Sequence, residues 1–148
     1  MKPIEEEKLT NLTEHFTIKE FTQSETARRL GIDNVPKPYQ IDNMCTLCKQ
    51  VLEPLRKEFG AIIITSGFRS AKLNKAVGGV MTSQHTKGEA ADLRIDSEER
   101  GQKMFEWIKN NTVFDQLIME HSRKTGASWL HVSSKYGKKN NRHQVMEL

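Results

Sequence analysis

The sequence lacks any apolar run long enough to cross a membrane, although 36% of its 148 residues are hydrophobic. Residues 1–8 are mostly charged and contain no apolar segment of the kind found in secretory signal peptides. We therefore expect a chain that is synthesised in the cytoplasm without a signal peptide and has no membrane span.

Cysteine is also scarce, since only Cys45 and Cys48 are present, in a single CxxC. One pair is too few for a zinc knuckle, and a redox CxxC would follow a strand, whereas this one lies within a helical pattern. We expect both to be ordinary helix residues, one of which packs as a small hydrophobe.

Neither sign of charge dominates, because the net charge is only +4 and the lysines are scattered without an arginine-rich run. We therefore expect no nucleic-acid partner. The length suits one compact domain rather than two, and we expect a lead-in over residues 1–15, a single domain over residues 16–148, and a monomer. Basic residues near the C-terminus, which we expect to be solvated, are Lys135, Lys138, Lys139 and Arg142.

Apolar periodicity predicts helices alternating with short strands. The strand over 90–95 should place Asp92 and Arg94 on one face and Leu93 and Ile95 on the other. The pattern favours an α+β fold, with a small antiparallel sheet and helices packed mainly on one side. The expected helices cover about 24–31, 40–59 with a kink or restart at Pro54, 72–77 and 97–110, and the expected strands cover 61–65, 90–95, 116–120 and 128–132.

The most informative segment is Ser-Gln-His-Thr-Lys-Gly-Glu-Ala-Ala-Asp, residues 83–92. His85 and Asp92 lie seven residues apart, with Gly88 between them to turn the backbone, and His131 lies far downstream. Two imidazoles and one carboxylate suit zinc. Three protein ligands leave a fourth position for water, which is typical of a catalytic rather than a structural zinc site.

Three ordered blocks, Ser-Gly-Phe-Arg at 66–69, the segment 83–92 and Trp-Leu-His-Val-Ser at 129–133, resemble the D-Ala-D-Ala carboxypeptidase family of zinc metallopeptidases. That family includes murein carboxypeptidases, phage endolysin peptidases and the D,D-dipeptidases of vancomycin resistance. The resemblance covers roughly residues 16–133, and the segments 16–21 and 73–79 are similar to its phage and prophage branch. It implies the fold shared with hedgehog signalling domains, and zinc ligands at His85, Asp92 and His131.

Arg69 stands in the block where relatives keep an arginine at the site. A guanidinium there can hold a substrate carboxylate or stabilise the oxyanion that forms during the reaction. Ser83 and Gln84 flank His85, where they either hydrogen-bond the substrate or cap the loop. Trp129, beside His131, either lines the site or fills the core.

The general base is the point at which the sequence departs from some relatives. They carry a glutamate or histidine three residues before the last ligand, where this chain has Ser128, which cannot deprotonate water. Glu120 is the predicted replacement, because it ends the strand expected to pair with the strand of His131. Asp115 is the second choice.

The sequence thus predicts a zinc-dependent metallopeptidase that hydrolyses peptidoglycan stem peptides, either as a D-Ala-D-Ala carboxypeptidase or as an endolysin-type endopeptidase. Such an enzyme would act on the cell wall after release through a holin pore or by lysis. The alternative is a zinc-bound module of the same fold without catalytic activity. The presence of Ser128, in place of the ionisable residue of some relatives, supports this alternative.

Overall fold

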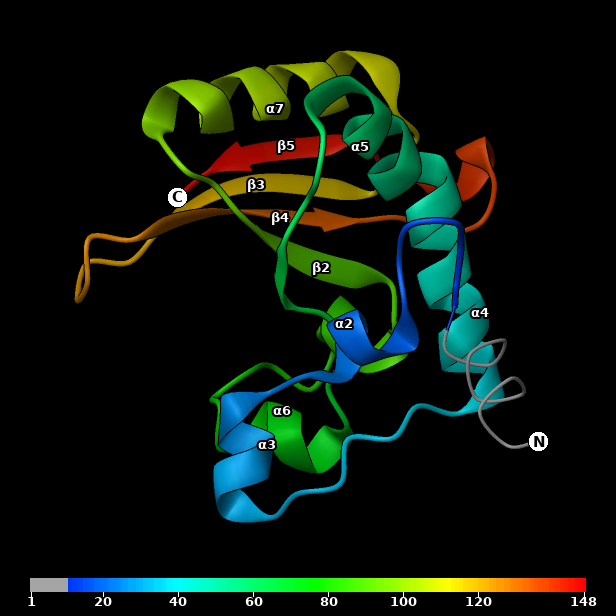
Figure 1. Cartoon of the computed structure of the whole chain (residues 1–148), viewed down its shortest axis with the longest axis vertical. Helices are drawn as coiled ribbons and strands as arrows, with labels where there is room; N and C mark the ends of the chain where they lie inside the picture. The colour runs from blue at the N-terminus through cyan, green and yellow to red at the C-terminus, as the bar shows by residue number, and fades with distance from the viewer. Residues whose placement is uncertain (1–10) are drawn as a thin grey trace.

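The computed structural model describes residues 11–148, in which helices cover a five-stranded sheet (Figure 1). The strands lie in the order β1-β2-β4-β3-β5. Their bounds are β1 Ile64–Ser66, β2 Ala90–Arg94, β3 Gln116–His121, β4 Ser128–Ser133 and β5 Gln144–Glu147. The expected α+β class is confirmed, but the sheet is mixed rather than antiparallel, because β5 pairs with β3 in parallel.

The helices divide into a group that packs on the sheet and a smaller group at the opposite end of the molecule (Figure 1). The first group is α4 Pro38–Leu47, η1 Cys48–Leu52, α5 Glu53–Phe59 and α7 Glu98–Asn111. The second contains α3 Glu25–Leu30 and α6 Ala71–Ala76, which contact each other. The remaining short helices are α2 Ile18–Thr22, η2 Gln84–Lys87 and η3 Lys138–Asn140. None of the helices within residues 11–148 combines the length and apolar character needed to traverse a bilayer.

The sheet has two chemically different faces, because side chains alternate along each strand. One face joins the hydrophobic core and carries Ala91, Leu93, Leu117, Met119, Leu130 and Val132. Asp92 and His131 lie directly opposite each other at the alternate positions, and so face away from that core. The predicted division of the β2 strand, with Asp92 and Arg94 on one face and Leu93 on the other, is confirmed.

The long helix expected over 40–59 is divided into three parts by Pro54. Proline has no N–H to donate to the carbonyl four residues earlier, so an uninterrupted α-helix would lose a hydrogen bond there. The chain responds with the π-helical turn η1, in which the Glu53 N–H donates to the Cys48 carbonyl five residues back. Cys48 is fully buried, and burial raises the pKa of its thiol, so the expectation that one cysteine of the pair packs as a small hydrophobe is confirmed.

Several boundaries differ from the expected ones. β1 begins at Ile64 rather than at residue 61, because the chain there is an edge with a register shift and Ile63 is 49% exposed. The short helix α2 was not among the expected helices, and Phe16 and Phe21 are buried in the core on either side of its start. Residues 1–10 of the expected lead-in lie outside the described residues, and Leu12, in its remaining part, is buried.

The C-terminal segment is not simply solvated, because Arg142 is tied to the body of the fold. Its guanidinium and its backbone N–H donate to the carboxylate of Asp115, which is fully buried at the start of β3. Burial alone would raise the pKa of Asp115, but the hydrogen bonds and charge of Arg142 outweigh burial and lower that pKa to about 2. This contact brings residues 144–147 alongside β3, where they form β5.

Replacing Arg142 with Ala is expected to lower the free energy of unfolding at pH 7 by about 1–3 kcal/mol, because it leaves a buried carboxylate short of donors. The folded-state pKa of Asp115 is depressed, so the stabilisation is complete above the ordinary carboxyl pKa of about 4 and disappears as the pH falls through about 2. Chemical denaturation of wild type and Arg142→Ala, at pH 7 and at a pH of about 2, measures how the stability difference between them changes. Lys139→Ala, an exposed neighbour, is the control, and equal stability of wild type and Arg142→Ala would contradict the assignment.

Candidate metal centre

His85 is held by a loop whose backbone geometry requires glycine. The Ser83 hydroxyl accepts from the His85 N–H at 3.2 Å, and the His85 carbonyl accepts from the Arg69 N–H at 3.0 Å. Gly88 then turns the chain with φ +76°, and a Cβ at that position would lie 2.4 Å from the Gln40 carbonyl oxygen. The loop is therefore fixed against α4, and no other residue fits at position 88 without displacing that helix.

The orientation of the His85 ring is set by the Ser66–Arg69 turn. Its Nδ1 lies 2.6 Å from the Gly67 carbonyl oxygen, which can only accept, so Nδ1 carries a hydrogen and Nε2 is the ring atom left to bind a metal. The turn itself packs tightly, because a Cβ at Gly67 would lie 2.7 Å from the Phe21 carbonyl oxygen. Gly67 thus serves the site through its carbonyl and through its lack of a side chain.

His85, Asp92 and His131 converge on one point. Asp92 Oδ1 lies 3.4 Å from His85 Nε2 and 3.0 Å from His131 Nδ1, and the three ligand atoms all lie within 4.8 Å of one another. In a tetrahedral zinc site with bonds of about 2.0–2.1 Å, neighbouring ligand atoms lie about 3.3 Å apart. The donor set and its spacing therefore fit zinc, with one side of the cluster left for a non-protein ligand.

Asp92 is ionised although it is buried. Burial works to raise the pKa of Asp92, but the hydrogen bonds and charges of His131 and His85 outweigh burial and lower it below the ordinary value. The carboxylate is therefore ionised, as a metal ligand must be. Arg69 Nη2 lies 3.9 Å from the other oxygen, Asp92 Oδ2, so the guanidinium stands beside the ligand cluster.

Two hollows near the cluster share Thr65 in their linings. One, of about 260 Å³, is lined by Arg69 together with residues from α3 and α6. The other, of about 420 Å³, is lined by Asp92, Arg94 and Trp129. Arg69 is further held by Asn74, whose Oδ1 accepts from its Nη1 at 3.3 Å.

The other predicted site residues lie in different surroundings. Ser83 contacts the loop of His85, and the Gln84 amide donates to Asp115 at 3.0 Å, so contact of either with a substrate stays a prediction. Asp115 has both oxygens occupied by Arg142 and Gln84, which leaves it no lone pair directed at the metal. Glu120 pairs with Trp129, on the same face of the sheet as His131, and its role as base also stays a prediction.

Sequence reasoning missed two supporting contacts, the Gly67 carbonyl on His85 and the Asn74 side chain on Arg69. Neither carries a signal of its own, since glycine and asparagine are common in turns. The Ser-Gly-Phe-Arg block at 66–69 indicated a turn that presents Arg69, but gave no sign that the Gly67 carbonyl orients His85.

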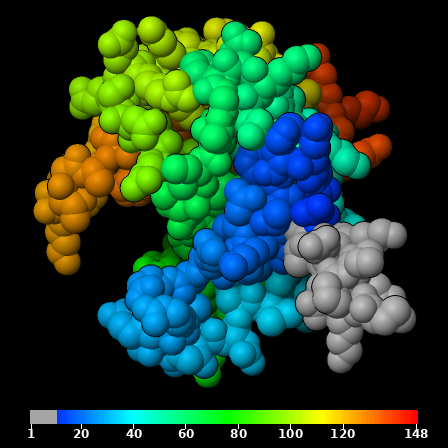
Figure 2. All heavy atoms as spheres, viewed as in Figure 1, coloured from blue at the N-terminus to red at the C-terminus, as the bar shows by residue number. Residues whose placement is uncertain are grey.

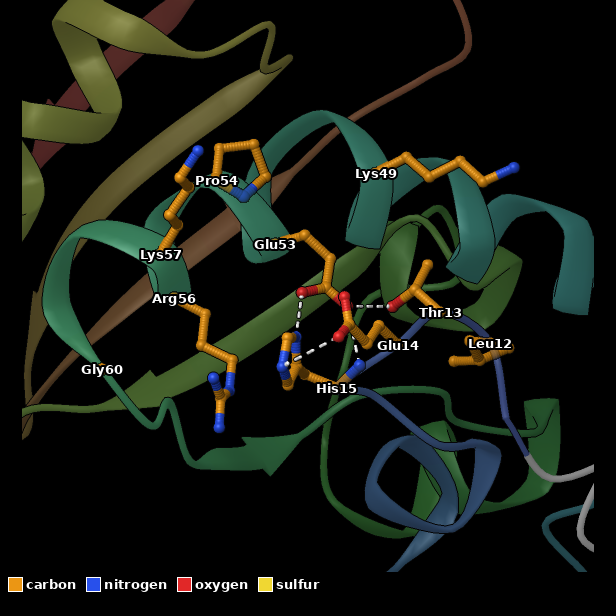
Figure 3. A pocket seen from close by; sticks show the side chains of 10 residues that line it. All are labelled: Leu12, Thr13, Glu14, His15, Lys49, Glu53, Pro54, Arg56, Lys57 and Gly60. Carbon is orange, nitrogen blue, oxygen red and sulfur yellow. Dashed lines mark hydrogen bonds and ion pairs between the residues drawn. The ribbon is translucent and has the colours of Figure 1, made fainter.

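A hollow of about 1060 Å³ elsewhere on the molecule contains none of the three ligands (Figure 3). It lies between the segment 12–15 and helices η1 and α5, where Thr13 and His15 hydrogen-bond the Glu53 carboxylate at 2.6 and 2.7 Å. Burial favours a higher pKa for Glu53, but these hydrogen bonds outweigh it and lower that pKa. These contacts anchor the N-terminal segment to the helix.

Comparison with known families gives a match to the family model described as Peptidase M15, over residues 14–133. The matched range contains all three candidate ligands and Arg69, and it ends with the last residue of β4. No curated protein matches the chain.

The purified protein is expected to bind about one zinc ion per chain, and His131→Ala should lose it, because the two remaining ligands cannot hold the metal tightly. Inductively coupled plasma mass spectrometry on the dialysed protein measures the zinc content. His15→Ala removes an imidazole outside the cluster and should keep the metal. Full zinc occupancy in folded His131→Ala would show that the ligand set is wrong.

Proposed function

This chain belongs to the peptidase M15 family, and we propose that it hydrolyses peptide bonds in peptidoglycan stem peptides. Peptidases of this family depend on zinc, for which the His85, Asp92 and His131 cluster supplies the ligands. The observation that carries the murein proposal is the guanidinium of Arg69 beside that cluster, at the mouth of a hollow. Stem peptides are short and rich in free carboxylates, which a fixed guanidinium binds well.

Each polar side chain around the cluster has a role in this reaction. Zinc, when bound, polarises the scissile carbonyl and activates water. Arg69 binds the substrate oxygen that carries negative charge, and its contact with Asn74 keeps the guanidinium in place. Ser83 and Gln84 position the loop of His85, and we propose that they also contact the substrate.

Glu120 is the proposed general base. Ile118 pairs with His131, and Glu120 pairs with Trp129. Glu120 therefore lies on the same face of the sheet as His131, two residues along β3 from the position opposite it. Among the described residues, none hydrogen-bonds to its carboxylate, which is therefore free to accept a proton. Ser128, where some relatives carry an ionisable group, is instead hydrogen-bonded to His121.

The bond cleaved is either the terminal D-Ala-D-Ala bond or an internal bond of the stem peptide, with action on the wall after release from the cell. Incubation with purified muropeptides, with and without a chelator, tests the proposal, and mass spectrometry of the products identifies the bond. Chelator-sensitive cleavage is expected. A zinc-loaded protein that leaves all muropeptides intact would favour the non-catalytic alternative.

Arg69→Lys is expected to lower kcat/KM on muropeptides by about a hundredfold, although it keeps the charge, because an ammonium group lacks the planar pair of donors. Steady-state kinetics measure the loss. Arg29→Lys, on the exposed surface of α3, is the matched control and should behave like wild type. Turnover close to wild type in Arg69→Lys would remove this residue from the mechanism.

Glu120→Gln is expected to keep its zinc but lose most activity, because an amide cannot accept the proton from the attacking water. Metal content and muropeptide hydrolysis are measured on the same preparation. Glu106→Gln, an exposed change on α7, is the control. An active, zinc-loaded Glu120→Gln variant would mean that another group activates the water.

A further inference from the structure

The backbone on both sides of Arg94 fixes its position near the metal cluster. Arg94 follows Asp92 by two residues on β2, so the two side chains leave the same face of the sheet about 7 Å apart. Its N–H donates to the Ile63 carbonyl at 3.0 Å, and across β4 it pairs with Trp129. Arg94 thus lies on the same face as Asp92 and His131, two residues along β2 from Asp92. Glu120 lies on the other side of β4, on β3.

The hollow of about 420 Å³ beside Asp92 is lined by the side chains of Arg94 and Trp129. It lies at the base of the β3–β4 hairpin, which projects from the body of the molecule (Figure 2). The one carboxylate in its lining is Asp92, whose oxygens face the two histidines and Arg69. The wall of the hollow therefore contains the Arg94 cation and the Trp129 ring. It contains no carboxylate that pairs with Arg94.

Two donor groups around this hollow have no acceptor. Within residues 11–148, no carboxylate lies within 4.0 Å of the Arg94 guanidinium; the nearby Asp96 is 3.9 Å from Arg100 instead. Trp129 Nε1 is buried and also has no hydrogen-bond partner among the described residues. Buried donors are normally satisfied in proteins, so Trp129 Nε1 lacks the acceptor expected of it, whereas the exposed Arg94 guanidinium is open to solvent and to a ligand.

The two arginines near the cluster differ in their surroundings. Arg69 has a side chain that is only 20% exposed, lies against Asp92 and is bonded to Asn74, so it belongs to the reaction centre. Arg94 is exposed, unpaired and in the other hollow. The two guanidinium groups therefore line different hollows, which share Thr65.

We propose that Arg94 binds a substrate carboxylate in the hollow beside Asp92, and that it makes the enzyme selective for acidic peptides. The proposal rests on the proposed function, because it names the substrate feature that this side of the same site recognises. A planar guanidinium and a carboxylate form two parallel hydrogen bonds, which neutral amides cannot match. Arg94 thus acts as a specificity residue rather than a catalytic one.

The carboxylate could be the terminal group of the peptide or a branch within it, and the test separates these sources. Three synthetic stem pentapeptides are compared: the free acid, a form with the terminal carboxyl amidated, and a form with the internal carboxyls amidated. For the zinc-loaded wild type, kcat/KM is expected to fall about ten- to a hundredfold in one of the two amidated forms. The form that loses activity identifies the carboxylate.

The preference is the kcat/KM for the free acid divided by the kcat/KM for the amidated form that loses activity. In Arg94→Gln this ratio should fall to near one. Arg94→Lys should retain part of the preference because the charge remains. Arg29→Gln is the control and should keep the wild-type ratio. Calorimetric titration of the same peptides into the zinc-loaded proteins gives the preference independently of hydrolysis. Arg94-dependent acid preference in binding, without cleavage, would sustain this inference while refuting the murein hydrolysis.

A wild-type preference that Arg94→Gln leaves intact would overturn the inference. So would the absence of any preference for the acid in both kinetics and binding.

Discussion

The antiparallel register between β2 and β4 is the constraint on which the site depends. It places Asp92 opposite His131 and, at the neighbouring positions, Leu93 opposite Leu130 in the core. A slip of one residue would send Asp92 into the core and Leu93 to the metal face, at the cost of burying a carboxylate among apolar side chains. The hydrophobic effect that forms the core therefore also sets the geometry of the ligands, although no ligand belongs to the core.

The third ligand comes from outside the sheet, and so needs support of a different kind. His85 sits on a short 3-10 turn, and its ring is aimed by the Gly67 carbonyl while its own carbonyl is held by the Arg69 N–H. The Ser66–Arg69 turn thus orients the His85 ring and also presents the Arg69 guanidinium. Because Gly67 packs on the backbone at Phe21, the N-terminal helix α2 contributes to the precision of a site that it does not contact directly.

The sequence was most predictive where local chemistry decides the outcome. Alternation along residues 90–95 placed Asp92, and the β3–β4 hairpin followed from two apolar runs. It was least predictive where distant residues meet. β5 forms because Arg142 is bonded to Asp115, and neither the sequence of residues 144–147 nor the charge of Arg142 announces a parallel strand. The roles of Gly67 and Asn74 likewise depend on tertiary proximity.

The two faces of the sheet separate stability from chemistry. The core face is apolar and closed by α5 and α7, whereas the metal face keeps hollows and donors without acceptors. Unsatisfied groups of this kind reduce folding stability and persist where a ligand meets them. Because side chains alternate between the two faces, a substitution at Arg94 or Trp129 changes the face that carries the ligands and leaves the core residues Leu93 and Leu130 in place. Under the function proposed for this chain, the positions next to the ligands along each strand can therefore set substrate selectivity without disturbing the core.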